Sequence, residues 1–287
     1  MNVTVGVPVF NGGSMLRESL GCLAGQTLRD FHVLIYDNAS TDETPHIAEE
    51  ICSADRRFRY VRQPENKGPA QNFIDVMEAC ETPFFLWRAH DDASDPEYLR
   101  TLLEALEAAP DAVLAAARIE QTRVGPDGAE KRRTVPFRLA RGDGAGPLIH
   151  NMRAVHQSWF YGLWRHAAIR EIWHRIYDAY PYAWASDFLM LFAALAQDGV
   201  TGSDRVAFRQ RIVEKPSQHL SQAAPRDARD LAERRRRFAA ICAEEVGLAE
   251  RPWLERVRLA AAIDRFTARR VGSRGRVAKL WMSGLHG

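Results

Sequence analysis

The sequence lacks the long apolar segments of a membrane-spanning protein and the leader of a secreted one. Among its 287 residues no apolar run reaches the roughly 18 residues that span a bilayer, and the best run, 188–196, is flanked by Asp187 and Asp198. The first residues, Met1-Asn2-Val3-Thr4-Val5, have no basic segment followed by an apolar one, so no signal peptide is expected. These absences predict a cytoplasmic protein and leave attachment to a membrane surface open.

The sequence also lacks the cysteine spacing of a disulfide framework or a zinc site. Its four cysteines lie far apart, without a CxxC pair or a neighbouring histidine. No low-complexity tract interrupts the chain, which is 46% hydrophobic and 26% charged, as in ordinary globular proteins. We therefore expect a folded chain with free thiols.

The first 120 residues alternate between short β-type runs and helix-type stretches. Strands are expected at 3–9, 31–36, 58–62, 84–87 and 112–119. This alternation is typical of an α/β protein with a mostly parallel sheet flanked by helices. Polar loops follow the first four strands, at 11–14, 37–42, 63–68 and 90–94. Because ligands bind at the carboxyl ends of such strands, we expect the site there.

The remainder of the chain shows a weaker pattern. Ser14 is expected to cap a helix that ends near residue 26, residues 125–151 are expected to be irregular, and 186–197 predict a helix. From Arg226 onward the chain is helical in pattern, with 15 Lys and Arg against 8 Asp and Glu. This region carries a formal charge of +7, and the rest of the chain −5.

Asp91 and Asp92 directly follow the apolar run 84–87. Neighbouring carboxylates at the end of a buried strand attract Mg²⁺ or Mn²⁺, and such a cation can hold a diphosphate as it leaves. The alternative is that both side chains cap a helix beginning near Asp95. Asp37 presents a similar choice between a contact to a nucleotide and a turn residue.

Four motifs occur in order along the first half of the chain. They are Val5–Asn11 (VGVPVFN), Asp37–Thr44 (DNASTDET), Glu65–Gly68 (ENKG) and His90–Asp92 (HDD). Their order and spacing resemble the inverting family 2 glycosyltransferases. The resemblance is strong to about residue 120 and continues more loosely, through 161–165 and Ser186-Asp187, to about residue 221. It implies a GT-A fold, with a mixed and mostly parallel sheet, and transfer of a sugar from a nucleotide-diphosphate sugar.

The resemblance assigns a nucleotide-sugar pocket to these motifs and to a later basic segment. The assigned residues are Pro8, Phe10, Asn11, Asp37, Asn66, Lys67, Gly68, Asp91 and Lys215. Asp37 is assigned to the base, which is uracil in many members, so a UDP-sugar is the favoured donor. Lys215 stands where many relatives carry a histidine before proline, with His219 a few residues later.

The resemblance assigns the metal to Asp92, but with a departure from the family motif. That motif is often Asp-x-Asp-Asp, whereas this chain has Ala89-His90-Asp91-Asp92. In this motif either Asp92 or Asp91 binds the metal alone, or His90 assists. Because Mg²⁺ prefers oxygen ligands, the other interpretation is that His90 forms hydrogen bonds and is not a metal ligand. Protonated Lys215 neutralises phosphate instead of binding metal. Both departures predict that the divalent cation, Mg²⁺ or Mn²⁺, is weakly held or dispensable.

The resemblance places the catalytic base at Asp187. A sugar hydroxyl attacks efficiently when a positioned carboxylate removes its proton, and a single displacement inverts the anomeric configuration. The alternative is a carboxylate that stabilises a helix N-terminus. Trp159, Tyr161 and Trp164 precede this residue and are expected to form an acceptor platform, with core packing as the alternative.

The basic C-terminal region has two interpretations. It contains Arg234–Arg237, the run 265–279, and an apolar stripe formed by Trp253, Leu254, Val257, Ala261 and Ile263. Solvated helix faces packed on the protein body are one interpretation. A membrane-surface patch attracted to anionic lipid and lipid-linked acceptors is the other. Because no recognised motif accompanies the charge, nucleic acid is not an expected partner.

We expect a GT-A-like domain at 1–221, with a nucleotide-binding half at 1–120 and an acceptor half at 121–221, followed by a helical basic extension at 222–287. The predicted function is inverting sugar transfer to a glycan or lipid-linked acceptor in bacterial surface polysaccharide synthesis, in the cytoplasm or peripherally at the inner face of the membrane. One alternative is a sugar nucleotidyltransferase, whose Gly-rich first loop contains a lysine that 11–14 lacks. The other is a non-catalytic nucleotide-sugar-binding protein.

Overall fold

The sheet is organised around β1 (Val3–Val9), in which every residue is buried. β1 pairs in parallel with β2 on one side and with β4 on the other, and the burial of all its residues means that both faces of the strand are covered. Pro8 lies beyond the last pairing with β4, which joins Gly6 to Trp87. Its missing N–H therefore removes no ladder hydrogen bond on that side.

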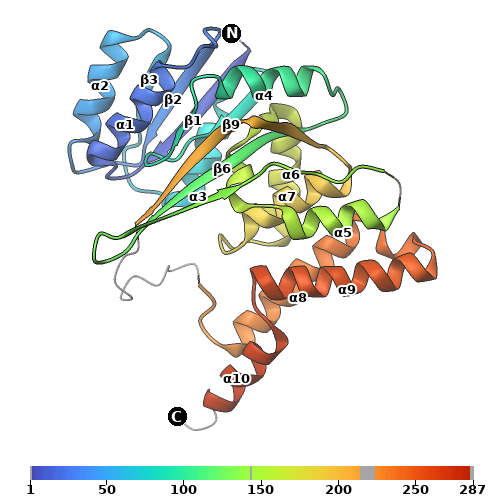
Figure 1. Ribbon diagram of the computed structural model, residues 1–287. Helices are drawn as coiled ribbons and strands as arrows, with labels where there is room; N and C mark the ends of the chain where they lie inside the picture. The colour runs from blue at the N-terminus through green and yellow to red at the C-terminus, as the bar shows by residue number, and fades with distance from the viewer. Residues whose placement is uncertain (1, 143, 214–223, 285–287) are drawn as a thin grey trace. The chain divides into compact units, whose positions relative to one another are not determined.

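The computed structural model describes residues 2–142, 144–213 and 224–284 (Figure 1). Within them, one sheet of nine strands has the order β3-β2-β1-β4-β8-β6-β9-β5, and β7 pairs with β6. The other strands are β2 (Phe31–Asp37), β3 (Phe58–Arg62), β4 (Phe84–Trp87), β5 (Ala93–Ser94), β6 (Leu114–Val124), β7 (Glu130–Val135), β8 (Leu163–Arg165) and β9 (Val200–Val213). The strands from β3 to β4 are parallel, and β8 pairs antiparallel to both β4 and β6.

Helices flank this sheet, as the sequence predicts. They are α1 (Gly13–Ala24), α2 (Thr44–Ala54), α3 (Pro69–Glu78) and α4 (Tyr98–Glu107). The order of strands moves outward from β1 to β3 and then returns to β4, so right-handed crossovers place α3 on the face opposite to α1 and α2. α3 contacts β1, β2 and β4, whereas α4 contacts β6, β8 and β9.

The chain divides into two compact units. The first comprises Met1–Phe137, Tyr161–Arg170 and Val200–Lys215 and contains the whole sheet; the second comprises Arg138–Phe160, Glu171–Gly199 and Pro216–Gly287. Helices of the second unit are α5 (Ala145–Ala154), η1 (Gln157–Tyr161) in most of its length, α7 (Ser186–Ala196), α8 (Ala228–Glu245), η3 (Leu248–Glu250), α9 (Trp253–Arg270) and α10 (Arg274–Gly284). α6 (His166–Ala179) belongs to both units. The domain boundaries expected from the sequence stay a prediction.

Phenylalanine rings form the core of the second unit. Phe266 of α9 lies 5.6 Å from Phe192 of α7 and 5.7 Å from Phe238 of α8, measured between ring centroids. Asp227 caps α8 by accepting a hydrogen bond from the N–H of Asp230 at 2.8 Å. The helical character predicted for the basic region is thus confirmed. Among the described helices, none combines the length and apolar composition that crossing a bilayer requires.

The expectation of an irregular segment at 125–151 is wrong, because this segment contains β7 and most of α5. β7 forms a hairpin with β6 through a turn in which the N–H of Gly128 donates to the carbonyl of Gly125. Five of its six residues are exposed and four of these are charged. It therefore shows no alternation of apolar and polar residues, the signal by which strands are recognised in sequences.

Gly202 of β9 provides a test of this pairing. It lies opposite Ala116 of β6 with φ +154°, and a Cβ added there would lie 1.9 Å from the Ala116 carbonyl oxygen. We expect Gly202→Ala to lower the free energy of unfolding by about 2–4 kcal/mol, because backbone strain and overpacking combine. Denaturant unfolding measures this change. Gly21→Ala, in α1 with no atom within 4 Å of the new Cβ, is the control and should raise stability by about 0.5–1 kcal/mol; equal effects would contradict the prediction.

Candidate functional site

The loops that follow β1 and β2 are joined to each other at the carboxyl edge of the sheet. Val9 pairs with Asp37, so the two strands end at the same level. Asn11, at φ 52°, donates its N–H to Ser40 Oγ at 2.9 Å and accepts the Thr41 N–H on its Oδ1 at 2.9 Å. Asn11, assigned to the nucleotide pocket, is therefore held as a bridge between the two loops.

The N-terminus of α1 is also held by the second loop. Gly12 donates its N–H to Thr44 Oγ1 at 2.9 Å, and Gly13 donates to Asp42 Oδ2 at 3.0 Å. Ser14 makes no cap, so the expectation that it would is corrected. Of the other residues assigned to the first motif, Pro8 is buried within β1, and the Phe10 side chain is exposed beside the joined loops.

Asp37 is completely buried at the end of β2. Its Oδ1 accepts the Ser40 N–H at 2.9 Å and its Oδ2 accepts the Tyr60 hydroxyl at 2.7 Å, while Arg62 Nη1 lies 4.0 Å away. Burial, and then the hydrogen bond to Asp37, raise the pKa of Tyr60 well above its ordinary value. In this conformation Asp37 fixes the second loop and β3 at the site edge. Its contact with a base stays a prediction.

Asn38 joins the second loop to the third and was not among the predicted site residues. Its amide donates to Asn66 Oδ1 at 2.9 Å and to the Gly68 carbonyl at 3.1 Å, and its Oδ1 accepts the Lys67 N–H at 2.9 Å. The predicted residues Asn66, Lys67 and Gly68 are thus brought to the same edge as Asp37. The Lys67 ammonium forms an ion pair with Asp75 at 3.1 Å.

A buried arginine, also absent from the predicted site residues, lies between β4 and the fourth loop. Arg88 has no exposed surface; its Nη2 donates to Ser94 Oγ at 2.8 Å, and its guanidinium lies 5.3 Å from the Phe208 ring centroid. Its Nε and Nη1 have no hydrogen-bond partner among the described residues. The signal available in the sequence was a charged residue directly after the apolar run of β4.

Asp92 is buried beside this arginine, whereas Asp91 and His90 are partly exposed. The capping interpretation is wrong for both carboxylates, because α4 begins at Tyr98 and has no side-chain cap. Asp92 Oδ1 accepts the Arg211 N–H at 3.3 Å. Burial, followed by repulsion from Asp91, raises the pKa of Asp92 to about 7, and the charge of Arg88 opposes this rise.

The carboxylates of this loop are too few for a metal site made of protein ligands alone, and they fit a cation that is also bound by a ligand's phosphates. No group of three or more His, Cys, Asp or Glu side chains among the described residues is arranged to hold a metal ion. Magnesium is commonly bound through one or two carboxylates together with substrate phosphates. Asp91 and Asp92 are two neighbouring carboxylates of this kind, and their role as metal ligands stays a prediction.

The end of β9 lies next to this loop. β9 pairs with β5 through Ala93 and Arg209, and Arg209 forms ion pairs with Asp95 and, at 3.2 Å, with Glu120. The described part of β9 stops at Val213. Lys215, which was assigned to the donor phosphates, and His219 lie outside the described residues.

Asp187 lies in the first turn of α7, in the second unit. Its Oδ1 accepts the Phe188 N–H at 2.8 Å. Burial raises the pKa of Asp187, while a hydrogen bond with Gln157 and the charge of Arg270 oppose the rise. A raised pKa brings a carboxylate closer to the value that suits a general base at neutral pH. Gln157 and Arg270 were not predicted as neighbours of this residue.

The three aromatic residues expected to form an acceptor platform differ in accessibility. Trp159 and Trp164 are only 1% and 0% exposed, so both are core side chains and the expectation of a three-ring platform is corrected. Tyr161 is partly exposed and its ring stacks on Phe208, with centroids 5.4 Å apart. An acceptor contact stays a prediction for Tyr161.

The buried charge of Asp92 predicts a pH-dependent stability. Because its folded pKa of about 7 exceeds its ordinary value of 3.8, Asp92 favours the folded state below about pH 4, and this contribution is lost as pH rises to about 7. With a chelator present, Asp92→Asn should raise the free energy of unfolding at pH 8, by up to about 4 kcal/mol, and change it little at pH 4. Urea unfolding at both pH values measures this. Asp111→Asn, at an exposed position, is the control; a gain of equal size at both pH values would contradict the assignment.

Matches to known proteins cover parts of the chain. It is 31% identical over 122 residues to EpsH of Bacillus subtilis (strain 168), covering 42% of this chain and 35% of EpsH. It is 29% identical over 91 residues to the teichoic acid poly(glycerol phosphate) polymerase of Staphylococcus epidermidis, covering 31% of this chain and 13% of that protein. The matched segments thus span about a third or less of these relatives.

Solved structures match the fold over nearly the whole chain. The structure of Staphylococcus aureus TarS residues 1–349 with UDP-GlcNAc matches with a TM-score of 0.65 and 18% identity, covering 94% of this chain and 72% of that one. Mannosyltransferase PcManGT from Pyrobaculum calidifontis, with GDP-Man and Mn²⁺, matches with a TM-score of 0.51 and 19% identity, covering 99% and 79%. The mixed sheet flanked by helices is therefore the GT-A fold.

A family model decides the classification. It matches residues 4–191, which include the four polar loops and Asp187. Because this match extends over more than half of the chain, the resemblance seen in the motifs is confirmed: the protein belongs to glycosyl transferase family 2.

Proposed function

We propose that this protein transfers a sugar from a nucleotide-diphosphate sugar, with a UDP-sugar as the favoured donor, to a glycan or lipid-linked acceptor. The observation that carries the proposal is the joining of the loops after β1, β2 and β3 through Asn11 and Asn38 in a member of this family. Related folds hold UDP-GlcNAc in TarS and GDP-Man in PcManGT, which supports this class of donor. The teichoic acid polymerase relative supports a role in bacterial surface polysaccharide synthesis.

The proposed reaction is a single displacement with inversion, and Asp187 is its base. The acceptor hydroxyl oxygen forms a bond to the anomeric carbon while the bond from that carbon to the diphosphate oxygen breaks. The hydroxyl proton passes to the Asp187 carboxylate, and the nucleoside diphosphate leaves with the bonding electrons. The raised pKa of Asp187 supports this role, because a carboxylate of higher pKa accepts the proton more readily.

Asp91 and Asp92 are the proposed cation ligands. A divalent cation there offsets the charge that develops on the leaving diphosphate. The buried guanidinium of Arg88 already balances part of the charge of Asp92, which supports weak or dispensable binding of Mg²⁺ or Mn²⁺. PcManGT is described with Mn²⁺, which supports a cation as such.

A non-catalytic nucleotide-sugar-binding protein is the second candidate, favoured by the missing leading carboxylate at Ala89. It predicts donor binding without transfer. A sugar nucleotidyltransferase is disfavoured because the first loop contains no lysine.

We also propose that the protein acts on the cytoplasmic side of the inner membrane and contacts it peripherally, where a lipid-linked acceptor is available.

Nucleotide binding tests the proposal as a whole. We expect isothermal titration calorimetry of the purified chain to detect UDP binding, because four polar loops supply hydrogen-bonding groups at one sheet edge. GDP, dTDP and CMP serve as comparisons, each with and without Mn²⁺. A small effect of Mn²⁺ on the UDP affinity is expected from the two-carboxylate site. If none of the four nucleotides binds, both the transferase and the binding-protein proposals fail.

Asp187→Asn separates catalysis from donor binding. The variant should lower kcat about 10²- to 10⁴-fold, because it loses a general base, and should leave the nucleotide Kd within about twofold. Release of nucleoside diphosphate from the sugar nucleotide that binds measures kcat, and proton NMR of the product measures the anomeric configuration. Asp178→Asn, at an exposed position in α6, is the matched control. The assignment of the base would be wrong if Asp187→Asn lost nucleotide affinity as strongly as it loses kcat, or if the product retained the anomeric configuration of the donor.

A further inference from the structure

The four consecutive arginines of the basic C-terminal region all form ion pairs within the second unit. Arg234 pairs with Asp230 at 2.7 Å, and Arg235 pairs with Asp264. Arg236 and Arg237 both pair with Glu233, at 2.9 and 2.7 Å. Every residue of the run Arg234–Arg237 therefore has an acidic partner on α8 or α9, and Arg236 and Arg237, of which Arg236 is 70% exposed, share Glu233.

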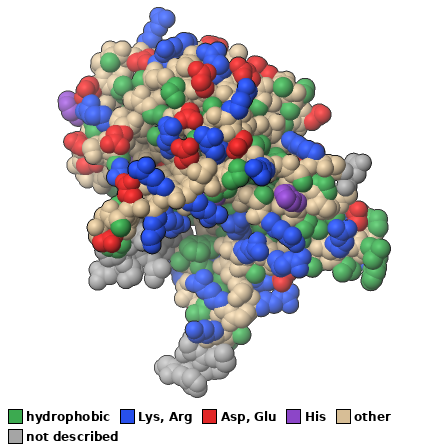
Figure 2. Space-filling model, viewed as in Figure 1, with side chains coloured by type: hydrophobic (Ala, Val, Ile, Leu, Met, Phe, Trp, Pro, Cys, Tyr) green, Lys and Arg blue, Asp and Glu red, His purple; other side chains and the backbone are tan. Residues whose placement is uncertain are grey.

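Unpaired positive charge is concentrated instead along α9 and the neighbouring α5. Arg258, Arg265 and Arg269 are exposed and follow one another at intervals of seven and four residues, which places them on one side of α9. Arg153 of α5 is also exposed, and none of these four forms an ion pair with a described residue. Figure 2 shows Lys and Arg side chains gathered over these helices, with hydrophobic side chains at one end.

An exposed apolar stripe runs beside this arginine row, which consists of Arg258, Arg265 and Arg269. Trp253, Leu254 and Val257 are 65%, 67% and 50% exposed. Their spacing places them within about 100° on the helix surface, on the side adjoining the row. Ile263 was expected to belong to this stripe, but it is buried on the inner face of α9, and that expectation is corrected.

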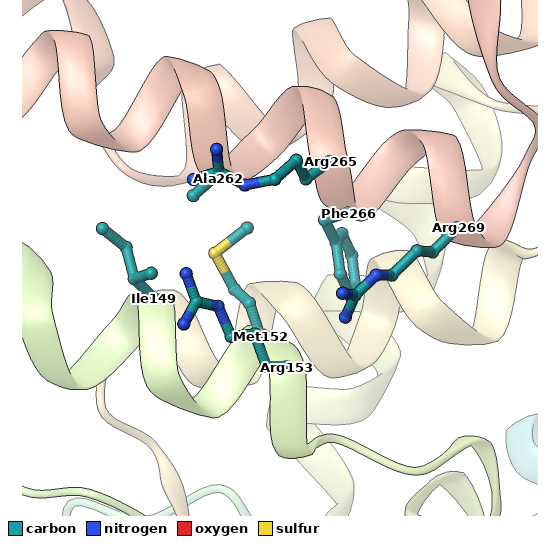
Figure 3. Close-up of a pocket in the computed structure, with 7 residues that line it drawn as sticks. All are labelled: Ile149, Met152, Arg153, Ala262, Arg265, Phe266 and Arg269. Atoms are coloured by element: carbon teal, nitrogen blue, oxygen red, sulfur yellow. The ribbon is translucent and has the colours of Figure 1, made fainter.

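A pocket between α5 and α9 opens on the same arginine row. It has a volume of about 180 Å³, several times the roughly 30 Å³ that one molecule occupies in liquid water. Its lining combines apolar and basic side chains: Ile149, Met152, Arg153, Ala262, Arg265, Phe266 and Arg269 (Figure 3). Met152 and Arg153 extend from α5 toward α9, and Arg269 reaches back along α9 toward Phe266. Burial, and then the charge of Arg269, lower the pKa of Arg270, while the charge of Asp187 opposes this.

We propose that α9 is a membrane-docking surface for bilayers that contain anionic phospholipids. Trp253, Leu254 and Val257 enter the interfacial region, and a lipid phosphate headgroup occupies the α5–α9 pocket between Arg153, Arg265 and Arg269. Tryptophan beside an apolar stripe, flanked by arginines, is the composition that binds such interfaces. The proposal deepens the peripheral membrane contact of the proposed function and rests on that part of it alone.

The charge pattern favours a lipid surface over a second copy of the chain. A symmetric dimer through this face would bring the unpaired arginine rows of two protomers together, and like charges in apposition oppose association. An anionic bilayer supplies the missing counter-charge along the entire row, with each basic residue near the surface contributing to binding. The phosphate of a lipid headgroup also matches the forked geometry of guanidinium groups.

Flotation of the full chain with vesicles tests the docking surface. We expect it to float with vesicles of phosphatidylcholine and phosphatidylglycerol, to float little with phosphatidylcholine alone, and to bind less at high salt. The double variant Arg265→Gln/Arg269→Gln should weaken partitioning about 20- to 30-fold. Arg236→Gln/Arg237→Gln removes the same charge from α8 and should change it less than about threefold. Equal losses would overturn the pocket, and absence of flotation by the unmodified chain would overturn the surface.

A variant of the apolar stripe tests its part in docking. Trp253→Ala/Leu254→Ala should also reduce flotation at least about tenfold, with circular dichroism confirming that the variants are folded.

Two further measurements identify other occupants. Calorimetric binding of inorganic phosphate without flotation would overturn the proposal in favour of a free anion. A dimer in light scattering that Leu254→Glu dissociates would overturn it in favour of a second copy. UDP calorimetry on the same protein separates the proposals. UDP binding without flotation removes the docking surface and the peripheral membrane contact but leaves the transferase, whereas flotation without binding of any tested nucleotide removes the transferase and the binding-protein proposals but leaves the docking surface.

Discussion

The register of three parallel strands is the constraint on which the candidate site depends. Val9 pairs with Asp37 and Asp37 pairs with Arg62, so β1, β2 and β3 end at one level. Their loops therefore begin side by side, and hydrogen bonds of Asn11, Asp37 and Asn38 fix them to one another. Because each loop holds the next, a change in one strand's register would displace the whole edge. Preorganisation of this kind lowers the entropy that a nucleotide must remove on binding.

Burial of charge is the second feature that shapes this edge. Arg88 and Asp92 are both buried, and isolated buried ions are costly unless a counter-charge is near. Asp91 adds a second carboxylate, and the result is a raised pKa for Asp92 despite the guanidinium. With Ala89 at the position of the family motif's leading carboxylate, the Arg88 guanidinium balances part of the charge of Asp92 that a metal would otherwise balance. We therefore expect a divalent cation to bind more weakly here than the family motif implies.

The sequence predicted those parts of the molecule in which local pattern and tertiary environment agree. β1, β3 and β4 match their expected bounds, because β1 and β4 are continuous apolar runs and β3 combines aromatic and β-branched residues before the turn that begins at Pro64. β7 was missed because it faces solvent, and β9 because no comparable apolar run marks it. Trp164 shows a different difficulty, since an aromatic residue looks the same in a sequence whether it packs in a core or contacts a sugar. Asn38 was missed because its partners lie about 30 residues away in the chain, and Arg88 because its burial depends on contacts such as that with Phe208 of β9.

The basic C-terminal region shows why counting charges does not locate a binding surface. Four consecutive arginines are its most prominent motif, yet acidic residues on α8 and α9 pair with all four. Arg258, Arg265 and Arg269 of α9 are dispersed in the sequence and still share one side of the helix, because their spacing follows its period. An electrostatic surface therefore depends on which charges lack a partner, and only three-dimensional contacts reveal this. The same reasoning applies to the exposed Trp253 and Leu254. They indicate a docking surface only because the arginine row beside them has no ion-pair partner among the described residues.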